Sequence, residues 1–189
     1  SVQVMQSYAN FTVGGAVSVN AHGRYMGQGA VVHSVREMTV VLANGERVRC
    51  SREERPDLFF AVVGGYGGLG VITELTLNLD EQAKLKRAVT EVTPEGYLSY
   101  FREHVEGKPE LVMHNADFFP PHYDRLFVTN WSKTDEAVTE EARFQERGED
   151  PFIYRAYRFV MGWLPGGQRL RPWLESIRQG QEVVEWRNY

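Results

Sequence analysis

The sequence is poor in cysteine, in long apolar runs and in excess charge of either sign. Its single cysteine, Cys50, excludes an internal disulfide and fits a reducing compartment. No apolar run approaches the roughly 20 residues that span a bilayer, and no signal peptide opens the chain. A net charge of −4 over 189 residues gives no general attraction to nucleic acid. We therefore expect a cytoplasmic globular protein with no transmembrane segment and no nucleic-acid partner, and its oligomeric state stays open.

Glycine, in contrast, gathers in two segments, residues 12–23 and 64–70. The second contains G-Y-G-G-L-G, which fits the spacing of the dinucleotide-binding fingerprint. That fingerprint needs a strand before the glycines and a helix after them, so that the helix N-terminus faces a pyrophosphate. Here the pattern predicts a short helix over residues 56–62 and a half-buried strand over residues 71–79. The order is reversed, which argues against a nicotinamide-binding Rossmann turn.

The rest of the first 80 residues predicts a small α+β unit. Residues 35–42 read as a strand, Asn44-Gly45 as a two-residue hairpin turn, and residues 47–50 as the returning strand. Gly14-Gly15 marks a turn or a close backbone approach, and residues 16–20 suit a short helix or an extended crossing. Cys50, near a strand end, is expected to be structural.

Composition changes at residues 80–84, which predicts a boundary. Strands are expected over residues 85–92, 111–118 and 126–131, with Pro120-Pro121 in the last connection. A helix should start from an N-cap at Thr93, end at Gly107 and carry an apolar stripe of Tyr97, Leu98, Phe101 and Val105. Residues 133–150 are densely charged and suggest a linker or a solvated surface. A further helix is predicted over residues 153–164, ended by Pro165. The fold class is α+β, with a second antiparallel sheet.

The residues alone leave two functions open. Glycine lets the backbone approach a flat or phosphorylated ligand, because no Cβ intervenes. The same glycines could equally form tight turns in a non-catalytic α+β binding or scaffold module. Four of the five histidines, His33, His104, His114 and His122, are scattered without metal-ligand spacing, so no metal site is expected.

Five stretches, in this order, resemble one family: T-V-G-G-A from Thr12, N-A-H-G from Asn20, V-V-L-A-N-G from Val40, D-L-F from Asp57, and G-G-Y-G-G-L-G-V-I-T from Gly64. Together they are similar to the second half of the FAD-binding domain of the vanillyl-alcohol oxidase/p-cresol methylhydroxylase flavoproteins. The His-Gly pair points to the branch of aldonolactone oxidase, alditol oxidase and decaprenylphosphoryl-ribose oxidase. The resemblance covers about residues 5–80.

The resemblance implies a protein that uses FAD to oxidise a CH–OH group of a sugar, polyol or lactone by hydride transfer to flavin N5. Residues 1–81 would be the C-terminal subdomain of the FAD-binding domain, and residues 85–189 the first part of the substrate domain. The implied FAD contacts are Thr12, Val13, Gly14, Gly15, Val19, Asn20, Ala21, His22 and Ile72. The first glycine segment would lie along the phosphates and ribityl chain of FAD, and the second would hold its adenine end or back the site.

Within the same resemblance, His22 would lie near the flavin and the substrate. The family's R-G-x-G motif, which wraps the pyrophosphate, does not occur in these 189 residues, and neither does the late part of the substrate domain. The catalytic residue is therefore unassigned, and we expect the 189 residues alone to be inactive.

Overall fold

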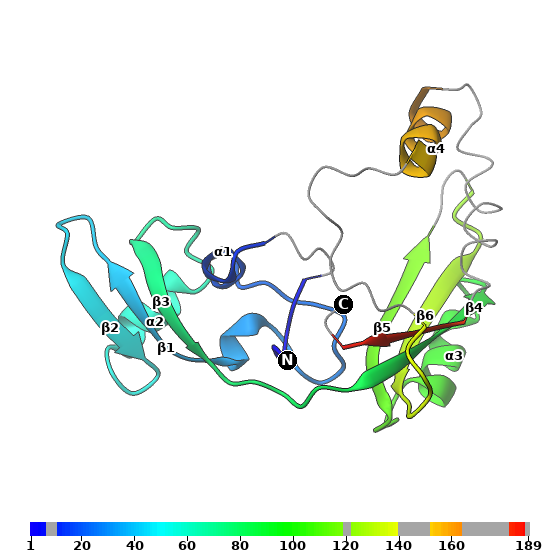
Figure 1. Ribbon diagram of the computed structural model, residues 1–189, viewed down its shortest axis with the longest axis horizontal. Coiled ribbons are helices and arrows are strands. Elements are labelled where there is room, and N and C mark those ends of the chain that lie inside the picture. Colours follow the sequence, from blue (N-terminus) through cyan, green and yellow to red (C-terminus); the bar gives the residue numbers. More distant parts are fainter. Residues whose placement is uncertain (7–10, 119–121, 140–151, 164–181, 188–189) are drawn as a thin grey trace. The chain divides into compact units, whose positions relative to one another are not determined.

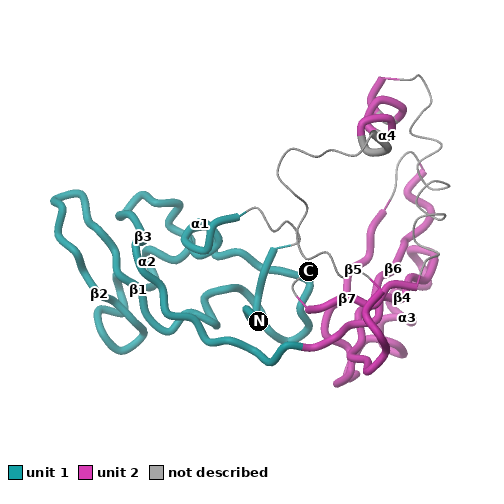
Figure 2. Tube along the Cα trace, viewed as in Figure 1, with its two compact units in different colours: residues 1–82, 188 teal, residues 83–187, 189 magenta. Residues whose placement is uncertain are grey.

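A computed structural model describes residues 1–6, 11–118, 122–139, 152–163 and 182–187. The chain divides into two compact units, residues 1–82 and residues 83–187 (Figure 2). Each unit has its own antiparallel sheet, with strand order β2-β1-β3 in the first and β5-β6-β4-β7 in the second (Figure 1). Helices and antiparallel sheets together confirm the predicted α+β class.

The first unit follows the order predicted from the sequence. Its elements are α1 (Val13–Ser18), the 3₁₀ helix η1 (Val31–His33), β1 (Val35–Val41), β2 (Arg47–Ser51), α2 (Pro56–Val62) and β3 (Val71–Leu77). The glycine loop, which we define as residues 64–70, therefore lies between a helix and a strand. This confirms that its G-x-G-x-x-G spacing does not form a Rossmann turn.

The turn between β1 and β2 is longer than predicted. Gly45 donates its backbone N–H to the carbonyl oxygen of Leu42 at 2.9 Å, and the Leu42 N–H donates to the Glu46 carbonyl at 2.9 Å. Gly45 has a φ of 83°, whereas Asn44 keeps a negative φ. A two-residue type I′ turn needs positive φ at both positions. The loop therefore has three residues, Ala43 to Gly45, and the two-residue prediction was wrong.

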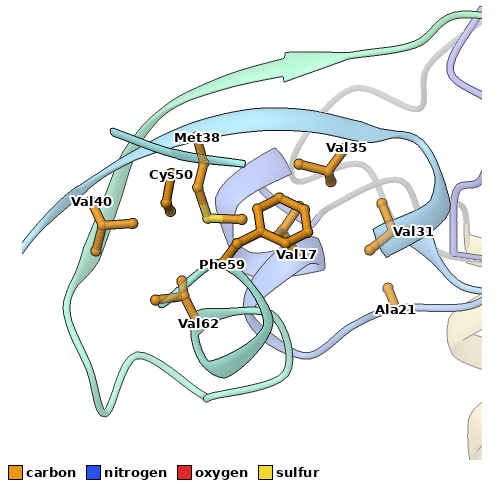
Figure 3. Close-up of a cluster of buried hydrophobic side chains, with 9 residues drawn as sticks. All are labelled: Val17, Ala21, Val31, Val35, Met38, Val40, Cys50, Phe59 and Val62. Carbon is orange, nitrogen blue, oxygen red and sulfur yellow. The ribbon is translucent and has the colours of Figure 1, made fainter. Parts of the chain in front are cut away.

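The core of the first unit lies between one face of this sheet and the helices α1 and α2 (Figure 3). Phe59, fully buried on α2, belongs to a cluster with side chains from α1, η1, β1 and β2. Full burial of such a ring contributes about 1.5–3 kcal/mol. The buried cluster consists of Val17, Ala21, Val31, Val35, Met38, Val40, Cys50, Phe59 and Val62. Cys50 is fully buried, as expected for a structural thiol.

A bulge in β3 explains why its apolar pattern is irregular. In the pairing with β1, Thr39 lies opposite Glu74 but Val40 lies opposite Ile72, so Thr73 is the extra residue. The bulge places Ile72 and Leu75, three residues apart, against the same apolar core.

The second unit contains β4 (Lys84–Val92), α3 (Tyr97–His104), β5 (Leu111–Phe118), β6 (Leu126–Lys133), α4 (Phe152–Trp163) and β7 (Val183–Trp186). The predicted strands and both predicted helices are present, whereas β7 was not predicted. The proline pair 120–121, most of the charged segment and the helix stop at residue 165 lie outside the described residues.

Helix α3 starts three residues after the predicted first helical position. Thr93 still accepts a hydrogen bond from the Gly96 N–H, at 3.2 Å, but residues 94–96 form a turn rather than the first helical turn. Of the predicted stripe, Val105 is buried, whereas Leu98 is 57% exposed. The stripe was wrong at Leu98, because the face of α3 that contacts the sheet carries Tyr97, Tyr100 and Phe101 instead.

Candidate functional site

The first glycine pair lies in a helix, not in a turn. Thr12 has an extended backbone, with φ −73° and ψ 153°, and its hydroxyl accepts a hydrogen bond from the Gly15 N–H at 3.1 Å. Thr12 is thus the N-cap of α1. Of the two alternatives predicted for Gly14-Gly15, a turn or a close backbone approach, the turn does not form, because both residues lie in the helix. A Cβ at Gly15 would lie 2.9 Å from the Thr12 hydroxyl oxygen, so a larger residue there would displace the capping side chain.

Gly14 faces the edge strand β3. A Cβ at Gly14 would lie 3.8 Å from the Ile72 carbonyl oxygen and 3.9 Å from the Ile72 Cβ. An open groove of about 450 Å³ runs beside this contact. Its lining residues are Val13, Gly14, Ile72, Thr73, Glu74, Leu75, Leu77 and Leu79. The structure therefore brings together three of the nine residues expected to contact FAD: Val13, Gly14 and Ile72.

The groove is mainly apolar. Among its eight described lining residues, Glu74 alone carries a charge, and its carboxylate accepts hydrogen bonds from Arg47 and Thr39 on the polar face of the sheet. Val13 is 53% exposed at the opposite wall. A surface of this kind suits a planar apolar ring, whereas a phosphate would need donors or cations that these side chains do not supply.

Three further expected residues form the end of α1. Asn20 adopts a left-handed conformation with φ 46°, and its side-chain oxygen accepts a hydrogen bond from the Val32 N–H at 3.3 Å. Ala21 is buried, and both its backbone groups are used, by Ala16 and by Val31. Val19 packs partly buried against the core. These residues hold α1 in place, and their contact with FAD stays a prediction.

His22 lies on the surface of the first unit. Its backbone forms an isolated antiparallel bridge with Ala30, and its side chain is exposed. It does not line the groove, so its expected position near the flavin and the substrate also stays a prediction.

A polar cluster in the second unit was missed from the sequence. The His114 Nε2 lies 2.8 Å from the Tyr97 hydroxyl, and its Nδ1 lies 2.7 Å from the Asn130 side-chain oxygen. The Asn130 amide donates to the Tyr100 hydroxyl at 3.0 Å. With the Asn130 oxygen as acceptor, Nδ1 carries the proton and Nε2 accepts from Tyr97. Burial raises the pKa of Tyr97, so this hydroxyl stays protonated and able to donate.

The sequence carried a signal for this cluster. Two tyrosines lie three residues apart on one predicted helix, and a polar residue interrupts each of two predicted strands, at His114 and Asn130. His114 and Asn130 face each other across β5 and β6, and cross-strand neighbours on one face regularly interact. Because the cluster packs α3 on the sheet, it explains the polar residues in structural terms.

The described residues contain neither a candidate metal site nor a candidate membrane-spanning helix. These residues include no group of three or more His, Cys, Asp or Glu side chains placed to hold a metal ion. Each described helix is too short or too polar to cross a bilayer.

The sequence of the chain is similar to those of known flavoproteins. Residues 2–51 match the FAD binding domain family. A Neurospora crassa protein with the provisional name D-arabinono-1,4-lactone oxidase is 45% identical over 181 residues, which cover 90% of this chain and 31% of that protein.

Cytokinin dehydrogenase 6 of Oryza sativa subsp. japonica is 38% identical over 88 residues, covering 46% of this chain and 17% of the relative. Cytokinin dehydrogenase 2 of Arabidopsis thaliana is 38% identical over 78 residues, covering 41% and 16%. The chain thus spans less than a third of the length of these relatives. The resemblance drawn from the glycine segments is confirmed at the level of an FAD-binding domain, by the match over residues 2–51 and by relatives named as a lactone oxidase and as cytokinin dehydrogenases.

Proposed function

We propose that these residues are part of an FAD-dependent oxidoreductase that oxidises a CH–OH group of a sugar, polyol or lactone. The observation that carries the proposal is the groove where Val13, Gly14 and Ile72 meet, inside the segments that resemble the FAD-binding domain. The lactone oxidase name of the Neurospora relative supports a small hydroxylated substrate. The chemistry that FAD supplies when bound is acceptance of a hydride at its N5 atom.

The groove fits part of FAD and not all of it. Ligand pockets that enclose a whole drug-sized molecule measure about 300–1,000 Å³ and bury most of its surface. This groove, of about 450 Å³, is open along one side and mainly apolar. It suits one planar ring of the cofactor, which would pack between Val13 on α1 and Ile72 on β3. The phosphates would then need donors from the backbone or from residues outside this chain.

Three residues near the groove have a proposed role. Thr12 fixes the start of α1 through the Gly15 N–H, and so sets where Val13 stands. Gly14 keeps the groove open, because any side chain at this position would enter the space beside Ile72. His22 is proposed to lie near the flavin and the substrate once the remaining parts of the site are in place.

The finer assignments belong to the same proposal. Residues 1–81 would be the second half of the FAD-binding domain, and residues 85–189 the first part of the substrate domain. The 189 residues alone would be inactive, because they lack the R-G-x-G motif of the family. A cytoplasmic location stays a prediction.

One observation favours the scaffold alternative for the second glycine segment. In the glycine loop, the backbone N–H groups of Gly64, Gly65, Tyr66 and Gly68 all donate within the protein. That loop therefore has a packing function of its own, and only the first segment supplies groove-lining residues to the proposed cofactor site together with β3.

The test uses the longer protein that contains these residues and compares Gly14→Leu with Gly27→Asn. Leu at Gly14 meets Ile72 at ordinary contact distance and extends into the groove, so FAD affinity should fall about tenfold or more while the fold persists. Gly27 has a φ of 73° with open space around its Cβ position, and Asn tolerates this conformation, so the control should bind normally. Affinity is read from quenching of flavin fluorescence. A wild-type protein that shows no flavin spectrum after reconstitution with FAD would overturn the proposal.

A further inference from the structure

The glycine loop contacts the end of α1 through its backbone. The Gly64 N–H donates to the Val17 carbonyl oxygen at 3.1 Å, and the Tyr66 N–H donates to the Ser18 carbonyl at 3.0 Å. The last carbonyls of a helix have no partner inside the helix and need an external donor. Two loop amides therefore bond to carbonyls at the end of α1 opposite to Thr12, where the Val17 carbonyl also accepts from the Asn20 N–H at 2.9 Å.

The loop adopts a strained conformation to place these amides. Tyr66 has a φ of 51°, in the left-handed region, where a bulky residue is an outlier. Its side chain is 80% exposed, so side-chain packing does not compensate for the strain. What Tyr66 contributes to the described structure is its N–H group, aimed at Ser18. Strain of this kind persists where the surrounding structure requires the conformation.

The other end of the loop packs closely against the strand β1. A Cβ at Gly70 would lie 2.6 Å from the Val41 carbonyl oxygen and 2.6 Å from the Val40 Cγ1, so only glycine fits there. Gly70 leads directly into Val71 and Ile72 of β3. The same seven-residue segment therefore holds α1 with its first half and sets the entry of β3 with its last residue.

We propose that the glycine loop is a positioning element for the groove. It fixes the distance between the α1 wall, with Val13 and Gly14, and the β3 wall, with Ile72, and it does so without contacting the cofactor. This inference rests on the proposed function for its consequence, FAD affinity. Its physical content, the coupling of the loop to α1, is independent of FAD.

The hydrogen bonds exclude the simpler role of a phosphate-binding loop. A phosphate cradle needs several backbone N–H groups pointing at the ligand. In residues 64–68 four of the five N–H groups are already used, two by α1 and two within the loop and the end of α2. The glycines are needed because of positive φ and close backbone contacts. They do not leave a row of backbone N–H groups available to a phosphate.

The experiment compares Tyr66→Pro with Tyr66→Gly in the longer protein. Proline removes the N–H and cannot reach a positive φ, whereas glycine keeps the N–H and relieves the strain. Amide hydrogen exchange of α1, at Ala16 and Val19, should accelerate about tenfold or more in the proline variant and stay at the wild-type rate in the glycine variant. FAD affinity should fall in the same pattern, by about tenfold or more in the proline variant alone.

A matched pair covers the case in which the proline variant does not fold. Gly64 and Gly67 have φ of 75° and 77°, so alanine is strained equally at both. At Gly64 the new Cβ lies 3.4 Å from the Asn20 Cβ at the end of α1, whereas at Gly67 it meets open space. Gly64→Ala should accelerate exchange in α1 more than Gly67→Ala does.

Two controls separate positioning from general destabilisation and from the proposed function. Val48→Ala weakens the same unit through β2, the strand that pairs with β1 and not with β3, and should leave α1 exchange and FAD affinity unchanged at temperatures well below unfolding. Unchanged α1 exchange in Tyr66→Pro, or an equal effect of Tyr66→Gly, would overturn the inference. Loss of FAD binding in the wild type would overturn only the proposed function, because the exchange result stands without the cofactor.

Discussion

The two units attach a helix to a sheet in different ways. In the first unit, α1 is held by the fully buried Val17 and by backbone hydrogen bonds from the glycine loop. In the second unit, α3 is held partly by Val105 and partly by the side chains around His114. Backbone contacts constrain where glycine must occur, whereas side-chain contacts constrain which polar residues must face each other.

The two kinds of attachment are sensitive to different substitutions. A helix held through the backbone responds to changes of φ and of N–H groups in a neighbouring loop, even at an exposed residue such as Tyr66. A helix held through a polar cluster responds to loss of one member, because the remaining buried groups lose their partners.

Removal of a core side chain should destabilise each unit separately. Phe59→Ala in the first unit should cost about 3–5 kcal/mol of unfolding free energy, and Leu85→Ala in the second about 2–5 kcal/mol, since both residues are fully buried. Urea denaturation measures both losses.

Cys50, the single cysteine, reports on the first unit alone. Burial raises the pKa of its thiol, which lowers the fraction of reactive thiolate in the native protein and makes alkylation slow. Phe59→Ala should accelerate alkylation of Cys50, whereas Leu85→Ala should not. Equal acceleration in both variants would contradict the division of stability between two units.

Loss of His114 should have the next largest effect. His114→Phe keeps the aromatic contacts with Phe101 but leaves the Tyr97 hydroxyl and the Asn130 side-chain oxygen without this partner. Each partly buried group left unpaired costs about 1–3 kcal/mol, so we expect a loss at the lower end of that range for each. Tyr97→Phe, which removes one hydrogen bond, should cost about 0.5–1.5 kcal/mol in the same denaturation assay. Equal losses in the two variants would contradict a role of His114 as the centre of the cluster.

Removal of the N-cap of α1 should have a smaller and more local effect. Thr12→Ala removes the acceptor for the Gly15 N–H and should cost about 1 kcal/mol. Hydrogen exchange at Gly15 should accelerate, while exchange in β1 stays unchanged. Thr12→Ser keeps the hydroxyl and should behave as the wild type. If the serine variant matched the alanine variant, the cap would not be the cause.

The element order was predictable because its signals are local. Proline at the start of α2, alternation in β1 and the Asn44-Gly45 pair each act within a few residues. The predictions of local conformation were wrong or incomplete where contacts between distant residues determine the structure. Gly14 and Gly15 favour turns by propensity, yet they are helical because Thr12 caps the helix and Val17 is buried beneath it. The four residues of β7 were missed because the strand exists only through its pairing with β4.

Of the nine residues expected to contact FAD, the structure groups three, and their contact with FAD stays a prediction. The resemblance placed Val13, Gly14 and Ile72 in one cofactor site, and the structure brings them to one groove. It could not assign the glycine loop to α1, because the bonds from Gly64 and Tyr66 join residues nearly 50 positions apart. Spacing motifs describe which residues need small side chains, but they do not say which carbonyl each amide meets.

The smallest expected effect concerns the polar face of the first sheet. A hydrogen bond from Arg49 is the main reason that the pKa of Glu37 lies below its usual 4.5. Since the native pKa is the lower one, the pair stabilises the fold above about pH 4.5, and this contribution is lost as the pH falls through the native pKa. The stability difference between wild type and Glu37→Gln should therefore shrink as the pH drops from about 7 to about 3. Because the pair is exposed to solvent, high salt should reduce the difference at neutral pH. Titration of the Glu37 carboxyl by NMR, with Arg49→Met as the control that moves the midpoint toward its usual value, checks the cause directly, and an unshifted midpoint in the wild type would refute it.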